Sequence, residues 1–85
     1  MAQFLVPSML ERRTHSRVVE ASGRTVREAI DDVDRKYQGF RDDLLSGGEL
    51  RGSFRIFIDD KFVDDIDAPI GEHVNIEILA PRVGG

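Results

Sequence analysis

The sequence contains no cysteine among its 85 residues. This absence excludes disulfides, thiolate metal sites and thiol nucleophiles, and it favours a reducing cytoplasm as the compartment. The two histidines, His15 and His73, stand far apart in the chain without a local ligand partner, so we expect no metal site. A Gly-rich phosphate loop, a Ser/His/Asp arrangement and zinc-ligand spacing are also missing. We therefore expect that the chain is not an enzyme.

Basic charge is also scarce, because 12 Lys and Arg residues stand against 16 Asp and Glu residues, giving a net charge of −4. A clustered basic surface is what nucleic-acid binding requires, so we expect no nucleic-acid partner. No apolar run approaches the roughly 20 residues of a membrane span, and the N-terminus lacks the layout of a signal peptide. The length predicts one small domain, and we expect a cytoplasmic protein without membrane attachment.

Alternating apolar residues predict strands over residues 2–6, 17–22, 53–58, 62–63 and 73–79. In the first strand, Phe4 and Val6 share the inner face and Leu5 takes the outer one. Residues 9–16 are polar and basic, and they are predicted to be a loop or hairpin connection with a solvated tip. Because the first two strands are adjacent in sequence, an antiparallel hairpin is expected there.

One helix is predicted between the second and third strands. Thr25 and Glu28 have the spacing of a capping box, in which each side chain satisfies an amide at the helix start. Gly39 is predicted as the residue that follows the helix C-cap. The apolar stripe at helical spacing consists of Val26, Ala29, Ile30, Val33 and Tyr37.

Two segments without strong periodicity are predicted to be linkers. In residues 38–52, Phe40, Leu44 and Leu45 could form a short apolar turn that ends at Gly47 and Gly48. Residues 64–71 form a loop anchored by apolar side chains. The aspartates between residues 59 and 67 are interpreted as solvated turn and loop carboxylates, with an acidic docking edge as the alternative.

The resulting order, β-β-α-β-β-β, indicates the α+β class. A single amphipathic helix cannot bury its stripe alone, and a sheet with one apolar face needs a cover. Packing the helix across a mixed sheet satisfies both requirements. If the first and last strands lie side by side at the centre, they run parallel, which is the β-grasp (ubiquitin-like) arrangement.

The C-terminal segment, Leu79-Ala80-Pro81-Arg82-Val83-Gly84-Gly85, carries the most specific functional signal. We predict a domain over residues 1–79 and a flexible Gly-Gly tail over residues 80–85. Six extended residues reach roughly 20 Å, far enough to carry a terminal carboxylate into a partner's channel. Two glycines without Cβ atoms can enter a narrow passage.

With this tail, the chain resembles the ubiquitin-like sulfur-carrier family of the MoaD, ThiS and CysO type. The resemblance covers the strand order, the capped helix, the long middle loop and the terminal glycines. Pro81, Gly84 and Gly85 match the family tail. Val83 and Arg82 depart from it, because family members usually carry Ala and Val at these positions.

The resemblance implies chemistry at the main-chain carboxyl of Gly85. An activating enzyme of the ubiquitin-activating type adenylates this carboxyl with ATP and Mg²⁺, and sulfur then replaces AMP to give a thiocarboxylate. A sulfur-accepting biosynthetic enzyme, for molybdopterin or another product, receives the sulfur. The chain itself is expected to bind no cofactor. The tail residues that contact partners are Pro81, Arg82, Val83 and Gly84.

The outer face of the sheet is predicted to carry a second partner contact. Leu5, Phe57 and Leu79 lie on the phase opposite the core residues, and together they would form an exposed apolar patch beside the tail. Two alternatives to sulfur carriage stay open. Gly85 could form isopeptide bonds, as in a protein modifier, or the domain could be a structural binding module with an incidental tail.

Overall fold

The computed structural model describes residues 1–80, and Pro81–Gly85 lie outside the described residues. Its elements follow in chain order. They are β1 (Ala2–Leu5), α1 (Ser8–Thr14), β2 (Val18–Ala21), α2 (Val26–Lys36), α3 (Phe40–Leu44), β3 (Leu45–Ser46), β4 (Glu49–Leu50), β5 (Arg55–Ile58), β6 (Lys61–Val63) and β7 (Asn75–Leu79).

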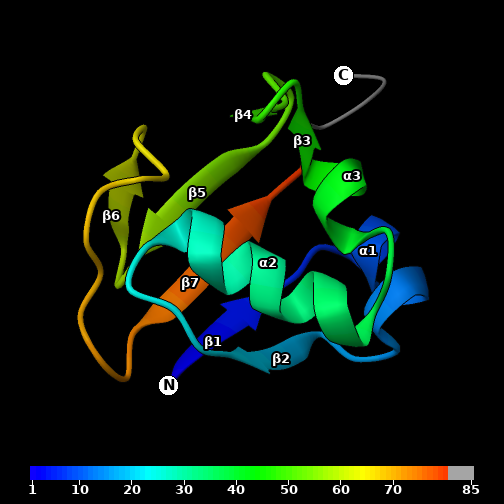
Figure 1. Ribbon diagram of the computed structural model, residues 1–85, viewed down its shortest axis with the longest axis horizontal. Coiled ribbons are helices and arrows are strands. Elements are labelled where there is room, and N and C mark those ends of the chain that lie inside the picture. Colours follow the sequence, from blue (N-terminus) through cyan, green and yellow to red (C-terminus); the bar gives the residue numbers. More distant parts are fainter. Residues whose placement is uncertain (81–85) are drawn as a thin grey trace.

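The main sheet has five strands in the order β2-β1-β7-β5-β6 (Figure 1). β1 pairs with β2 in antiparallel fashion and with β7 in parallel fashion. β5 pairs with both β7 and β6 in antiparallel fashion. The predicted side-by-side placement of the first and last strands is therefore confirmed, and it puts the C-terminal strand in the middle of the sheet.

Helix α2 packs across one face of the sheet, as the apolar stripe predicts (Figure 1). The hydroxyl of Thr25 accepts a hydrogen bond from the Glu28 amide at 3.1 Å. The Glu28 carboxylate accepts one from the Arg24 amide at 3.1 Å. The capping box is thus confirmed, although the carboxylate bonds the amide one residue before the expected one. The fully buried residues of α2 are Val26, Ala29, Ile30 and Val33.

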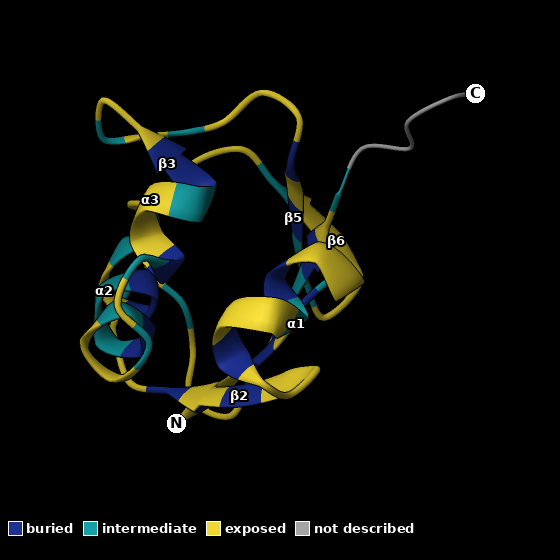
Figure 2. Ribbon diagram, turned by 90° about the vertical axis from the view of Figure 1, so that its right-hand side faces the viewer, coloured by how far each residue is buried: buried dark blue, intermediate teal, exposed yellow. Residues whose placement is uncertain are grey.

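The core lies between the helices and the inner face of the sheet. Figure 2 views these layers from the side, with α2 and α3 in one layer and β5 and β6 in the other. Phe4 on β1 meets Phe40 on α3 edge to face, with ring centroids 5.8 Å apart. Ile66 is buried and Ile70 packs partly against the core, so the loop after β6 is anchored as predicted. This is the predicted α+β architecture of the β-grasp type.

The prediction of a loop or hairpin tip over residues 9–16 is wrong, because Ser8–Thr14 forms helix α1. Leu10 and Thr14, one turn apart, are buried, and the Thr14 hydroxyl donates to the Ser16 carbonyl oxygen at 2.7 Å. Arg13 is not a freely solvated side chain, because its guanidinium donates hydrogen bonds to both carboxylate oxygens of Asp43 on α3, at 3.0 and 3.2 Å. Only these two positions face the core, and one of them is the polar Thr14, so the sequence does not display an apolar stripe at helical spacing.

Gly39 is also placed differently from the prediction. Tyr37 caps the C-terminus of α2, and Gly39, with φ of 105°, instead precedes α3 as its N-cap. The Asp34 carboxylate accepts hydrogen bonds from the amides of Gly39 and Arg41, which stabilises the turn between the two helices. The middle linker therefore contains a short helix, followed by a β3–β4 hairpin with Gly47 and Gly48 at positive φ.

Asp32 joins α2 to the end of β2. Its carboxylate accepts a hydrogen bond from the Ser22 amide at 2.9 Å and one from Arg35 at 2.8 Å. The Ser22 bond, with help from Arg35, lowers the pKa of the Asp32 carboxyl below its ordinary value. A lowered pKa in the folded state means that the ionised carboxylate stabilises the fold above the unfolded pKa. This contribution is lost as the pH falls through the folded pKa.

Replacing Asp32 by Ala is expected to lower the free energy of unfolding by about 1–2 kcal/mol at pH 7. The deficit should shrink as the pH falls below roughly 4, the ordinary pKa of an aspartate, and continue to shrink through the lowered pKa of Asp32 in the folded protein. Urea denaturation across this pH range measures both effects. Glu20→Ala is the matched control, because the structure gives the Glu20 side chain no hydrogen bond or ion pair within residues 1–80. An Asp32→Ala deficit that does not change with pH would contradict the assigned role.

Candidate functional site

The position of β7 determines where the C-terminal segment leaves the domain. β7 lies between β1 and β5, and its last residue, Leu79, is opposite Arg55 at the start of β5. Ala80, which the sequence assigned to the tail, is half-buried and packs partly against the core. The strand that precedes the last five residues is therefore a central strand of the sheet and not an edge strand.

The outer face of the sheet, opposite α2, carries one row of residues across all five strands. On β1, Leu5 is opposite both Val18 on β2 and Glu77 on β7. Glu77 is in turn opposite Phe57 on β5, and Phe57 is opposite Phe62 on β6. The structure thus places Leu5 and Phe57 on either side of the same glutamate, with Leu79 two residues further along β7.

Apart from Glu77, this row is apolar, and together with the neighbouring Leu79 it is accessible to solvent. The exposed fractions are 37% for Leu5, 45% for Val18, 41% for Leu79 and 57% for Phe62. Phe57 is half-buried, because its ring meets that of Phe62 edge to face at 5.7 Å. Because exposed apolar residues gathered on one face mark a partner site, we define an outer-face patch. Its members are Leu5, Val18, Phe57, Phe62 and Leu79.

Two members of this patch, Val18 and Phe62, are not among the residues predicted from the sequence. The signal for Phe62 was present, because the two residues Asp59 and Asp60 between adjacent strands specify a tight hairpin. The register of such a hairpin places Phe57 opposite Phe62. Val18 could not be recognised, because its register with Leu5 depends on the length of the unpredicted helix α1.

A hollow of about 580 Å³ adjoins the patch at the base of the tail. Leu5 and Pro7 line it on one side, and Leu79 and Ala80 on the other. Arg17 and Glu77 bring opposite charges to it. The Arg17 side chain is 77% exposed and lies 3.6 Å from the Glu11 carboxylate, a weak surface pair. The hollow therefore combines apolar and charged lining residues next to the end of the described chain.

Three of the aspartates after β5, Asp59, Asp60 and Asp67, contribute to the local structure. Asp59 and Asp60 have positive φ angles of 48° and 71°, which the turn requires, and Asp59 accepts a hydrogen bond from the Asn75 amide at 3.2 Å. Asp67 forms a two-point ion pair with Arg27 on α2 at 2.6 and 3.1 Å. Its hydrogen bond from Arg27 lowers the pKa of the Asp67 carboxyl. These contacts support the interpretation of turn and loop carboxylates.

The two histidines of the chain have local structural contacts. Within residues 1–80, no three His, Asp or Glu side chains come together in a metal-binding group. His15 caps α1 with a positive φ of 63° and its ring meets Tyr37 edge to face at 6.4 Å. The His73 amide donates to the Met1 carbonyl oxygen at 3.1 Å. Both histidines thus take part in local structure.

The fold and the outer face together define a class of protein. It is a β-grasp domain with an apolar outer face, in which the central strand β7 ends immediately before the C-terminal residues. The predicted tail contacts, Pro81, Arg82, Val83, Gly84 and the reactive Gly85, lie outside the described residues. Their roles stay predictions, as do those of Leu5, Phe57 and Leu79 in partner binding.

Comparisons with known proteins show the family. The model of the ThiS family matches residues 6–85. The chain therefore belongs to the ThiS family of ubiquitin-like sulfur carriers, which confirms the resemblance given by its sequence. A comparison with curated proteins gives no match.

Solved structures agree with this assignment. A chain of the Amycolatopsis orientalis BexX/CysO complex is 27% identical, with a TM-score of 0.93 and full coverage of both chains. Mycobacterium tuberculosis CysO is 25% identical, with a TM-score of 0.89, over 96% of this chain and 100% of that one. SAMP1 from Haloferax volcanii, at 17% identity and a TM-score of 0.80, covers 99% of this chain and 98% of its own, and it shares the fold.

None of the helices within residues 1–80 has the length and apolar character that crossing a membrane requires.

The Phe57–Phe62 contact can be tested by a double-mutant cycle with Phe57→Ala, Phe62→Ala and the double variant. We expect a coupling free energy of about 0.5–1.5 kcal/mol, because each single change already removes the edge-to-face contact. Urea denaturation of the four proteins measures it. If the free-energy changes of the two single variants add up to that of the double variant, the two rings do not contact each other. The row of outer-face residues would then not extend from β5 to β6.

Proposed function

We propose that this sulfur carrier works through the carboxyl group of Gly85, which a partner enzyme adenylates and converts to a thiocarboxylate. The observation that carries the proposal is the exit of the chain from the central strand β7, next to an exposed apolar face. The family match supports it, because it extends through Gly85. In this proposal, the domain is not a catalyst, and its only reactive group is the terminal carboxyl.

The chemistry explains why a partner and ATP are required. A free carboxylate is a poor acyl electrophile, because its leaving group would be oxide. Attack of the Gly85 carboxylate on the α-phosphorus of ATP releases pyrophosphate and gives an acyl-adenylate. A sulfur nucleophile then adds to the carbonyl carbon and AMP leaves, so that one carboxyl oxygen departs with AMP and sulfur takes its place. ATP and Mg²⁺ belong to the activating enzyme, and this chain binds neither.

The outer-face patch would hold the activating enzyme while the tail enters its active site. Apolar contacts to Leu5 and Leu79 supply affinity near the tail, and Glu77, between Leu5 and Phe57, offers a single negative charge within the patch. A complementary partner surface is therefore apolar, with a cation opposite Glu77. The overall charge of −4 favours the same partner through long-range attraction.

The thiocarboxylate would then donate sulfur to a biosynthetic enzyme. Two matching structures with at least 25% identity, one of them a complex, carry the name CysO in their descriptions. This favours a CysO-like carrier over a molybdopterin-synthase small subunit. A cytoplasmic location suits this role, because a chain without cysteine gains nothing from an oxidising compartment.

The reaction can be followed by mass spectrometry of the intact protein after incubation with ATP, Mg²⁺, a sulfur source and its activating enzyme. We expect a gain of about 16 Da, since sulfur replaces oxygen, located in the C-terminal peptide. Deletion of Gly85 should abolish the gain while circular dichroism and the melting temperature stay unchanged, because residues 1–80 form the core.

A gain elsewhere in the chain, or one that survives the deletion, would contradict chemistry at Gly85. Conjugates of higher mass that depend on Gly85 and a target lysine would instead indicate the protein-modifier alternative. Retained cellular function after removal of Gly84 and Gly85 would indicate a structural binding module.

Docking through the outer face is tested by Leu5→Ser. This change removes an exposed apolar side chain outside the Phe57–Phe62 contact, so it should raise KM for the carrier in the activation reaction by roughly tenfold and leave kcat almost unchanged. Asp42→Ser, an exposed change on α3 in the opposite layer, is the matched control and should leave both constants unaltered. Equal effects of the two changes would exclude the outer face as the docking surface.

A further inference from the structure

The two edges of the main sheet differ in whether their outward backbone groups have partners. On β2, the Val6 amide donates to the Arg17 carbonyl oxygen at 2.9 Å, so Arg17 faces β1 and the alternate residues Val18 and Glu20 face outward. The Ser16 hydroxyl bonds both the amide and the carbonyl oxygen of Val18, at 3.3 and 2.9 Å.

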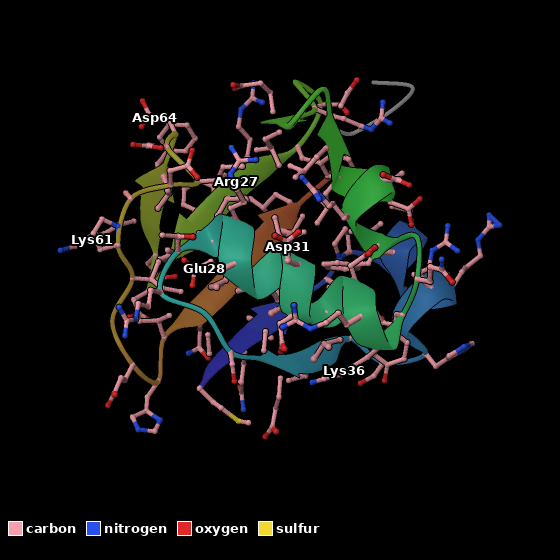
Figure 3. The ribbon with its side chains drawn as sticks, viewed as in Figure 1. Arg27, Glu28, Asp31, Lys36, Lys61 and Asp64 are labelled. Atoms are coloured by element: carbon pink, nitrogen blue, oxygen red, sulfur yellow. The ribbon has the colours of Figure 1, made fainter. Side chains whose placement is uncertain are left out.

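Further along the same edge, Lys36 donates to the Glu20 carbonyl oxygen at 3.2 Å, and Figure 3 shows this lysine close to β2. The Ser22 amide, which follows the strand, donates to Asp32. Side chains therefore occupy most of the outward groups of the β2 edge, namely both groups of Val18, the Glu20 carbonyl and the Ser22 amide, which opposes pairing with another strand there.

The β6 edge is different. The Asp59 amide donates to the Asn75 carbonyl oxygen at 3.1 Å, so Asp59 and the alternate residue Phe57 direct their backbone groups toward β7. Phe57 and Phe62 consequently form a pair without mutual backbone hydrogen bonds, and the amide and carbonyl of Phe62 point away from the sheet. Within residues 1–80, no side chain bonds either group.

The Phe62 side chain, a member of the outer-face patch, is also 57% exposed. A hollow of about 400 Å³ adjoins this edge, lined by Leu50 and Arg55 on one side and by Val63 and Ile66 on the other. An added strand would thus find two backbone partners at Phe62, an aromatic surface on one face and room for a side chain beside the other.

We propose that β6 receives an extended, basic segment of a partner protein as a sixth strand of the sheet. The charges around β6 determine what kind of segment fits. Asp60 and Asp64 flank Phe62 two residues away on either side, and Figure 3 shows Lys61 and Asp64 extending into solvent near this strand.

Pairing with a second copy of the chain is opposed by these charges. An antiparallel β6–β6 pair centred on Phe62 would place Asp60 of one copy opposite Asp64 of the other, and like charges directly opposite each other are destabilising. A segment with lysine or arginine two residues before and after a central apolar residue would place opposite charges at both positions. In an antiparallel pair, the central residue of such a segment lies opposite Phe62 and exchanges both backbone hydrogen bonds with it.

The proposal concerns strand pairing and is independent of the chemistry at Gly85. It can be tested with the synthetic peptide acetyl-Thr-Lys-Thr-Val-Thr-Lys-Thr-amide, titrated into the ¹⁵N-labelled full chain. We expect chemical-shift changes centred on residues 60–65 and slower hydrogen exchange of the Phe62 amide. A peptide with glutamate in place of both lysines should bind at least roughly tenfold more weakly.

Two variants separate backbone pairing from side-chain contact. Phe62→Ala removes the ring and keeps the amide, whereas Phe62→Pro removes both, and an outward amide makes proline tolerable at this edge. Phe62→Pro should bind the lysine peptide roughly fivefold more weakly than Phe62→Ala, the value of one hydrogen bond. As a test that leaves the protein unchanged, N-methylation of the valine amide of the peptide should also weaken binding.

Absence of binding, shift changes centred on β2, or equal affinity for the lysine and glutamate peptides would each overturn the proposal. So would an unmethylated and an N-methylated peptide that bind equally well. Formation of the Gly85 thiocarboxylate can be measured on the same protein sample. A failure of strand pairing is therefore distinguishable from a failure of the sulfur-carrier chemistry.

Discussion

The parallel pairing of β1 with β7 is the constraint on which the rest of the structure depends. It places the last strand between β1 and β5, where its inward residues Ile76 and Ile78 are buried under the helices. A strand held on both sides cannot fray without disrupting the sheet. The point at which the C-terminal segment begins is therefore fixed relative to the outer face. A partner that binds this face consequently also has the start of that segment at a fixed position.

The same constraint divides the residues of the sheet between two tasks. Residues on the inner face pack against α2 and α3 and stabilise the domain, whereas their neighbours along each strand form the outer-face patch. Leu5, between the buried Phe4 and Val6, shows this division in three consecutive positions. An exposed apolar row adds little to the stability of the isolated domain, which makes a role in partner binding the economical explanation for it.

Much of this organisation could be predicted from the sequence, because it depends on strong local patterns. The stripe of α2 with its Thr25 cap and the alternation in β7 each specify one element without ambiguity. Helix α1 could not be predicted. Only Leu10 and Thr14 face the core, and with the charged Arg12 and Arg13 between them the segment shows no hydrophobic periodicity typical of a helix. Likewise, Gly39 carries the signature of a helix end, but tertiary packing of Phe40 against Phe4 makes it the start of the next helix.

The outer face was only partly predictable, because a patch depends on register between strands. The sequence indicates that Leu5 and Phe57 share a face, but their placement around Glu77 requires both the parallel and the antiparallel pairing of β7. The most direct measurement is hydrogen exchange of this chain in complex with its activating enzyme. Protection concentrated in β1, β5 and β7 is expected if the enzyme grips the outer face. Protection concentrated on the exposed side of α2 and α3, with the strands unchanged, would contradict it.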